Sequence, residues 1–118
     1  MNYSFNLKPQ YFIAIKSGTK TIEGRAPKNE KDKTFDEMVF DDVITFINQE
    51  TGEQLTCSVL AVNKYSNTKE MLEVNGLKNI LPGVFTIEEG IAIYNDLKDY
   101  KERIVRFGIY AIVFKLLN

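Results

Sequence analysis

The sequence predicts an α+β protein built on a small mixed, mainly antiparallel β-barrel with two or three flanking helices. Two strongly strand-like runs, residues 43–47 and 55–64, are joined by a short polar segment that contains Gly52, which is typical of a hairpin. Segments with helix signals interrupt the remaining strand-like runs. A late apolar run, residues 105–117, returns as another strand.

The first residues predict a half-buried strand followed by a short helix. Tyr3, Phe5 and Leu7 alternate with polar residues, the period of a strand with one buried face. Pro9 suits the first turn of a helix, and Gly18 suits its C-terminal end.

Residues 20–25 are expected to be extended, and the polar stretch 26–36 to be an exposed loop. The loop assignment follows from Pro27, mixed charges and the lack of any hydrophobic period. A mobile flap beside a functional site is the alternative, since loops often carry function.

Two capping boxes mark the start of two further helices. Asn67 with Glu70 begins one that Gly76 ends, and Thr86 with Glu89 begins another of about three turns.

Two strand-like runs carry more detailed expectations. In the run 55–64, alternation should place Leu55, Cys57, Val59 and Ala61 on one face. The apolar, β-branched run 105–117 should be a central strand. Gly108 within that run indicates a bulge or a close approach of another backbone.

Length and composition favour one globular domain spanning residues 1–118. The chain is 44% hydrophobic and 26% charged, as ordinary globular proteins are. Its apolar runs are too short to cross a bilayer, so no membrane association is expected. The first residues show neither a basic start nor an apolar signal segment, and we therefore expect a cytoplasmic protein.

The residue inventory excludes several kinds of chemistry. With no histidine, the chain has no Ser-His-Asp or Cys-His catalysis, and we expect neither a metal site nor a cofactor. Cys57 is the only cysteine, which excludes an internal disulfide and favours a small buried hydrophobe. The net charge of −1 disfavours tight, nonspecific binding to duplex nucleic acid, although a local basic cleft remains compatible with it.

The segment 18–25 contains the residues best suited to chemistry. Glu23 and Arg25 share a face of an extended strand, while Lys20 faces the other side unless the preceding turn re-aims it. Arg and Lys would bind a phosphate or a base edge, whereas a desolvated Lys beside a carboxylate would act as a nucleophile or proton carrier. An exposed ion pair without function is the third interpretation.

The pattern Gly18-x-Lys20-x-x-Glu23-x-Arg25 resembles the signature of the ASCH (activating signal cointegrator homology) family in the PUA-like superfamily. The resemblance extends along the chain through Phe12, Ile15, Asp42–Phe46, Tyr65-Ser66, Met71-Leu72, Leu81–Gly83, Tyr94 and Gly108–Ile112. Asp41 departs from it, standing where the family usually has glycine.

This resemblance implies a barrel with a cleft that binds RNA or a nucleotide. Lys20 and Arg25 would contact phosphate or a base edge, and Glu23 would orient one of them or accept a base amino group. Tyr65 would stack on a base or simply pack at a strand end. Tyr110 would reach the cleft or fill the core. Ser66 is a further candidate for binding, although the start of the next helix explains it better.

The family's acetylcytidine amidohydrolase branch uses a Lys, a Thr and a downstream Glu. Lys20 matches the first, but Glu23 stands at the Thr position and Pro82 at that of the Glu. That activity is therefore not carried over to this chain.

A second basic cluster follows the third predicted helix: Lys98, Lys101, Arg103 and Arg106. It is either a solvated helix end or a patch that binds successive phosphates of a nucleic-acid backbone.

Three functions are consistent with these features. The leading one is an RNA- or nucleotide-binding domain. The second is a small hydrolase acting on a modified nucleoside or on RNA, with Lys20 and Glu23 as its catalytic pair. The third is a protein-interaction domain. A catalytic Lys20 should be buried with a lowered pKa, whereas a binding Lys20 should stay charged near the rim.

Overall fold

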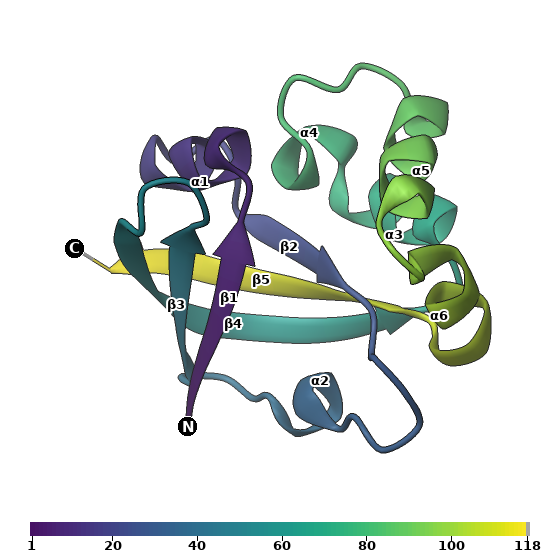
Figure 1. Cartoon of the computed structure of the whole chain (residues 1–118), viewed down its shortest axis with the longest axis horizontal. Helices are drawn as coiled ribbons and strands as arrows, with labels where there is room; N and C mark the ends of the chain where they lie inside the picture. The colour runs from purple at the N-terminus through teal and green to yellow at the C-terminus, as the bar shows by residue number, and fades with distance from the viewer. Residues whose placement is uncertain (118) are drawn as a thin grey trace.

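The computed structural model describes residues 1–117 and contains one curled, five-stranded sheet (Figure 1). The strand order is β1-β3-β4-β5-β2, with β1 paired in parallel to β3 and every other pair antiparallel. The strands are β1 (Asn2–Leu7), β2 (Ile22–Arg25), β3 (Val43–Asn48), β4 (Gln54–Tyr65) and β5 (Ile109–Leu117). Because β1 and β2 are the two edges, the barrel is open between them.

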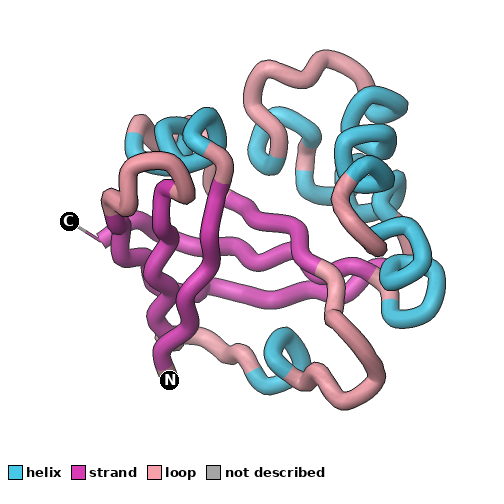
Figure 2. The backbone as a smooth tube through the Cα atoms, viewed as in Figure 1, coloured by secondary structure: helices cyan, strands magenta, loops and turns pink. Residues whose placement is uncertain are grey.

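Helices pack around this half-barrel, and Figure 2 shows most of them gathered on one side of it. They are α1 (Pro9–Lys16), α2 (Thr34–Glu37), α3 (Thr68–Asn75), α4 (Leu77–Ile80), α5 (Ile87–Asp96) and α6 (Tyr100–Phe107). The α+β, mainly antiparallel barrel class is thus confirmed. Within residues 1–117 there are six helices, not two or three; α2 and α4 have only four residues each, too short for a periodic signal.

Two hydrophobic cores hold the sheet and the helices together. One fills the inside of the curled sheet with residues that include Phe12, Phe46 and Val59. The other joins the sheet to α3–α6 through residues that include Met71 and Ile109. Cys57 is fully buried in the first core, and burial raises the pKa of its thiol to about 11, so it behaves as a small hydrophobe.

The predicted helix starts are confirmed at atomic detail. Asn67 Oδ1 accepts a hydrogen bond from the Glu70 amide at 2.8 Å, and Thr86 Oγ1 accepts one from the Glu89 amide at 3.1 Å. Each bond satisfies an amide that has no partner within its own helix. Gly76 follows α3 with a φ of 88°, as expected for a terminating glycine.

The expected alternation along β4 is wrong beyond Val59. The register against β5 shifts between Val59 and Ala61, which indicates a bulge at the exposed Leu60. Val62, and not Ala61, then packs against the core inside the sheet. One extra residue in a strand moves every later side chain to the opposite face.

The expected strand 105–117 begins only at Ile109. Residues 105–107 instead complete α6, in which Ile104 is buried and Val105 is exposed. Packing of the Ile104 face outweighs the weak strand preference of the β-branched residues. The remaining strand is hydrogen-bonded to β4 on one side and β2 on the other, so its interior position is confirmed.

The polar stretch 26–36 is a loop up to residue 33, after which α2 begins. Asp32 organises this loop by accepting hydrogen bonds from the Lys28 amide and from the amide and hydroxyl of Thr34. Phe35 in α2 is buried, so the end of the stretch is anchored to the inner core. No helix within residues 1–117 is long and apolar enough to span a bilayer.

Candidate functional site

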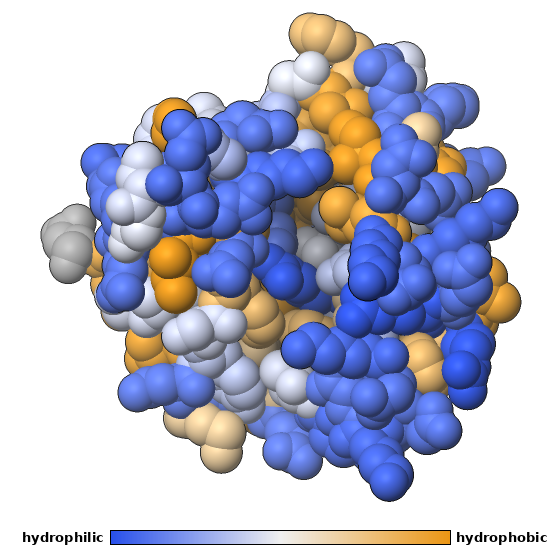
Figure 3. All heavy atoms as spheres, in the orientation of Figure 1, coloured by the Kyte–Doolittle hydropathy of each residue, from blue (hydrophilic) through white to orange (hydrophobic). Residues whose placement is uncertain are grey.

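A pocket opens where α1, β2 and α5 meet, close to the gap between the two edge strands. Its cavity volume is about 230 Å³. Figure 3 shows a hollow near the centre of this face, with mostly hydrophilic surface around it and apolar surface on the side of α4 and α5. The pocket is lined by Asn6, Leu7, Lys8, Tyr11, Lys20, Glu23, Gly24, Arg25, Gln49, Leu81, Ile93, Tyr94, Leu97, Lys98 and Tyr100.

Lys20 lies at the floor of the pocket and is only 2% exposed. Its Nζ donates to the carbonyl oxygens of Ile22 at 2.7 Å and Ile80 at 2.5 Å, and lies 3.1 Å from Glu23 Oε1. Three acceptors match the three N–H groups of an ammonium, whereas a neutral amine has only two. The geometry is therefore that of a charged lysine held by the protein.

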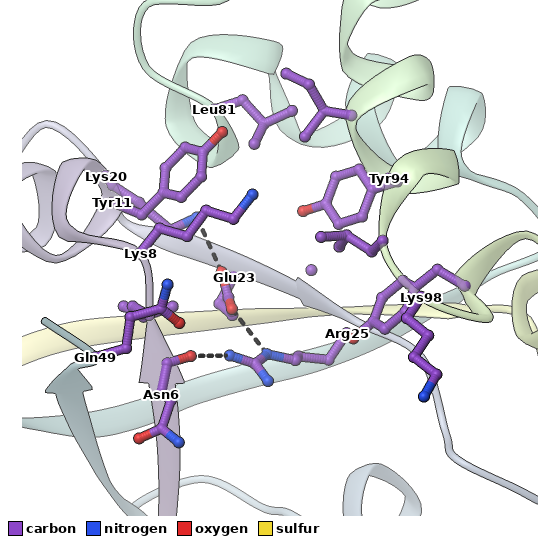
Figure 4. A pocket seen from close by; sticks show the side chains of 15 residues that line it. Asn6, Lys8, Tyr11, Lys20, Glu23, Arg25, Gln49, Leu81, Tyr94 and Lys98 are labelled. Atoms are coloured by element: carbon purple, nitrogen blue, oxygen red, sulfur yellow. Dashed lines mark hydrogen bonds and ion pairs between the residues drawn. The ribbon is translucent and has the colours of Figure 1, made fainter.

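Glu23 bridges Lys20 to Arg25 across the strand face (Figure 4). Its Oε2 accepts a hydrogen bond from Arg25 Nε at 2.8 Å, and Arg25 Nη2 donates to the carbonyl oxygen of Asn6 at 2.9 Å. The Arg25 guanidinium also lies 4.7 Å from the centre of the Phe5 ring. Since Asn6 and Phe5 belong to β1, Arg25 spans the opening between the two edge strands.

Lys20, Glu23 and Arg25 form a triad in which burial and neighbouring charges have opposite effects on each pKa. Burial lowers the pKa of Lys20 below its ordinary value, and the attraction of Glu23 only partly restores it. Burial alone would raise the pKa of Glu23, but attraction to Lys20 and Arg25 outweighs it and holds that pKa below its usual range. For Arg25, burial acts to lower the pKa, and Glu23 leaves it raised. Glu23 is therefore ionised at neutral pH.

The structure brings Lys20, Glu23 and Arg25 into one pocket, although strict alternation would direct Lys20 away from the other two. β2 starts only at Ile22, so Lys20 lies in the turn that precedes it. The Lys20 amide donates to the carbonyl oxygen of Ala14 at the end of α1, and this turn aims the side chain toward Glu23. Turn geometry, and not strand geometry, completes the triad.

Three other predicted site residues lie elsewhere, and none of them lines this pocket. Tyr65 packs against the core on the helical side, and Ser66 is exposed. Tyr110 lies in the core inside the sheet, where its hydroxyl donates to the Asp36 carboxylate. Burial, together with that hydrogen bond, raises the pKa of Tyr110 to about 12. The core-filling interpretation of Tyr110 agrees with this placement.

The pocket lining has a positive net charge, although the net charge of the whole chain is negative. Four cationic side chains line it (Lys8, Lys20, Arg25 and Lys98) against one carboxylate, Glu23, which leaves a balance of 4 − 1 = +3. The whole chain has a net charge of −1. Charge of one sign gathered in a concave site attracts ligands of the opposite sign. In residues 1–117, no group of three His, Cys, Asp or Glu side chains is placed to hold a metal ion.

A comparison with protein families identifies the fold as that of a known domain. The ASCH domain model matches residues 5–118, nearly the whole chain and all three members of the triad. The chain belongs to the ASCH domain family. ASCH domains have a PUA-like fold and are often linked to RNA binding.

Three solved structures are similar to this ASCH domain. The hypothetical protein PH0355 is 36% identical, with a TM-score of 0.83 over 99% of this chain and 100% of that one. Protein PF0455 from Pyrococcus furiosus is 37% identical, with a TM-score of 0.75 over 100% and 99%. The ASCH protein from Zymomonas mobilis, 12% identical with a TM-score of 0.62 over 95% and 65%, shares the fold. No protein of curated function matches the chain.

Several residues that line the pocket of this ASCH domain were not predicted from the sequence. Lys8 and Tyr11 come from the start of α1, and Tyr94 from α5; Figure 4 shows the Lys8 ammonium and the Tyr94 hydroxyl pointing into the pocket. Tyr94 is 4% exposed, and no group in residues 1–117 forms a hydrogen bond with its hydroxyl. The spacing of Tyr94 along the helix indicated only that it lies on the buried face. Such spacing is the same for a tyrosine that only packs and for one whose hydroxyl also binds a ligand.

Gly24 allows Tyr94 to lie directly against β2. A Cβ atom at this position would overlap the Tyr94 hydroxyl oxygen and lie 2.9 Å from Met71 Cε. We expect Gly24→Ala to destabilise the fold by about 1–3 kcal/mol, as overpacking does, and to displace Tyr94 from the pocket wall. Urea unfolding measures the loss.

The double variant Gly24→Ala/Tyr94→Phe tests the cause, because it removes the hydroxyl that the new methyl group would meet. It should be less destabilised than the sum of the two single variants predicts. Additive effects would show that contact with Tyr94 is not what requires glycine at this position.

Proposed function

We propose that this ASCH domain binds RNA or a nucleotide in the pocket lined by Lys20, Glu23 and Arg25. The observation that carries the proposal is the local charge of +3 in the pocket of a chain whose net charge is −1. Such a site suits a nucleotide, because its lining combines cationic side chains with aromatic and aliphatic ones and a nucleotide combines a charged phosphate with a flat, stackable base.

The triad members have different roles in this proposal. All three N–H groups of Lys20 are engaged by the protein, and its side chain is 1% exposed, so it positions Glu23 and the strand. The Arg25 side chain is 23% exposed and uses Nε and Nη2 in the protein, which leaves further N–H groups for a phosphate. Lys8 and Lys98 supply additional charge at the rim.

The uncharged part of the pocket lining suits a base. Tyr11, Tyr94 and Leu81 contribute aromatic and aliphatic surface, and the Tyr94 hydroxyl is available to a base edge. The cavity of about 230 Å³ is smaller than the roughly 300–1,000 Å³ of pockets for drug-sized ligands, so it has room for one nucleotide unit at most.

One observation favours a hydrolase as the second candidate. Lys20 is buried, and burial lowers its pKa, which are the features expected of a catalytic lysine. Against this, Lys20 would become nucleophilic only by losing one of its three ammonium protons, each of which has an acceptor in the protein. The binding function therefore has the stronger support.

Calorimetric titration with nucleoside 5′-monophosphates tests binding. Loss of hydrogen bonds to a charged group is worth about 1.5–3 kcal/mol, so Arg25→Ala should raise Kd by about 10- to 150-fold. Arg25→Lys keeps the charge without the planar fork and should fall between Arg25→Ala and the wild type. Lys69→Ala is the matched control, since this exposed lysine lies on α3 outside the pocket lining.

Two outcomes would contradict the proposal. Binding that is equally strong in Arg25→Ala and the wild type would place the ligand elsewhere. Turnover of acylated nucleosides or of RNA that is lost in Lys20→Ala and in Glu23→Ala would favour the hydrolase instead.

A further inference from the structure

Two further hollows follow the pocket in series, each sharing lining residues with the one before it. The second, of about 630 Å³, shares Asn6, Arg25 and Tyr100 with the pocket and runs along β1 and the loop 26–34. The third, of about 300 Å³, shares Lys28 and Arg103 with the second and ends beside α6. We call the second and third hollows together the basic groove.

Positive charge continues along this groove from the pocket. Arg25, Lys28 and Arg103 line the second hollow against one carboxylate, Asp32, a balance of 3 − 1 = +2. That carboxylate already accepts three hydrogen bonds from its own loop. The third hollow adds one cation, Arg106, which pairs with Glu30 at 3.4 Å, and two lining carboxylates, Asp99 and Glu102. The groove as a whole is therefore lined by four cations against three carboxylates, a balance of 4 − 3 = +1.

Two of these cations lie over aromatic rings. The guanidinium of Arg25 lies 4.7 Å from the centre of the Phe5 ring, and that of Arg103 lies 5.0 Å from the centre of the Tyr100 ring. Phe5 and Tyr100 line the second hollow as well, so they combine apolar surface with fixed positive charge. Alternating cations and aromatic rings are typical of surfaces that bind single-stranded nucleic acid.

From this continuity we propose that the basic groove binds the next nucleotides of a single strand whose first nucleotide occupies the pocket. Arg25 contacts the phosphate at the junction, and Lys28 and Arg103 contact the phosphates that follow. The inference rests on the proposed function of the pocket and specifies its ligand as a single-stranded oligonucleotide, not a free mononucleotide. A duplex hides the faces of its bases, whereas a single strand exposes them to the guanidinium and aromatic surfaces that line the groove.

The test compares two probes on the full chain: uridine 5′-monophosphate, and a fluorescein-labelled single-stranded oligouridylate of about eight nucleotides. The oligonucleotide should bind more tightly. In Lys28→Ala/Arg103→Ala the ratio of the two affinities should fall. The slope of log K against log salt for the oligonucleotide should become less steep by about 0.7 for each lost phosphate contact. Arg106→Ala, a second variant, should change the slope in the same direction.

The matched control is Lys69→Ala/Lys115→Ala, which removes the same charge from two exposed lysines outside the linings of the pocket and the groove. It should leave the ratio and the slope as in the wild type.

The outcomes separate the groove from the pocket. If the mononucleotide binds as tightly as the oligonucleotide, the proposal for the groove is wrong and the proposal for the pocket is unaffected. An equal change of slope in the control variant, or equal affinity for a duplex of the same length, also overturns the groove. If neither probe binds the wild type, both proposals fail.

Discussion

Lys20→Met is expected to destabilise this ASCH domain by about 3–5 kcal/mol, the usual consequence of removing one partner of a buried ion pair. The methionine would leave the carbonyl oxygens of Ile22 and Ile80 without their donor, and Glu23 with Arg25 as its remaining charged partner. Each buried polar group that loses its partner costs about 1–3 kcal/mol. Because Ile80 ends α4, we also expect the junction between α4 and β2 to loosen.

Chemical unfolding of Lys20→Met, Glu23→Gln and the double variant forms a cycle that isolates the pair. The double variant should be less destabilised than the sum of the single variants, because each second substitution removes a group that has already lost its partner in the Lys20–Glu23 pair. Strict additivity, or a loss below about 1 kcal/mol for Lys20→Met, would show that Lys20 is not held as an ion-paired ammonium.

The pH dependence gives an independent check on the same triad. The folded-state pKa of Glu23 is lowered, so its contribution to stability is present above the unfolded pKa and is lost as pH falls through the folded value. The free energy of unfolding of the wild type should therefore fall in acid more steeply than that of Glu23→Gln. Parallel curves for the two proteins would contradict the lowered pKa.

Gly108→Ala is the second substitution for which we expect a large effect, a loss of about 2–6 kcal/mol from two additive causes. Gly108 joins α6 to β5 with φ 77° and ψ −172°, a conformation that is essentially limited to glycine. A Cβ atom there would also lie 2.6 Å from the backbone oxygen of Tyr65. That oxygen cannot move away easily, because Tyr65 is paired with Ile109 in the sheet.

Gly52→Ala is the matched control, since Gly52 has a φ of 78° but nothing within 4 Å of an added Cβ atom. It combines a positive φ with no such contact and should lose less stability, as thermal or urea unfolding will show. Equal losses at the two positions would mean that contact with Tyr65 contributes nothing.

The sequence alone was enough to predict most of the local structure, because the signals that determine it lie within a few residues of one another. Asn67 and Thr86 begin their helices through hydrogen bonds to amides three residues ahead. The alternation of apolar and polar residues in β1 correctly predicted which face of the strand is half-buried. Errors arose where packing outweighed local preference, as at the start of β5 and at the bulge after Val59.

The candidate site was also predicted only in part from the sequence. The sequence by itself determined that Lys20, Glu23 and Arg25 are close along the chain, since eight residues contain the whole signature. Only the tertiary structure decided that Lys20 turns inward, because one of its acceptors, the Ile80 carbonyl, lies 60 residues away. Tertiary packing also put Tyr94 in the pocket wall and Tyr110 in the core. Spacing along a chain limits which groups can meet, and burial among distant elements selects those that do.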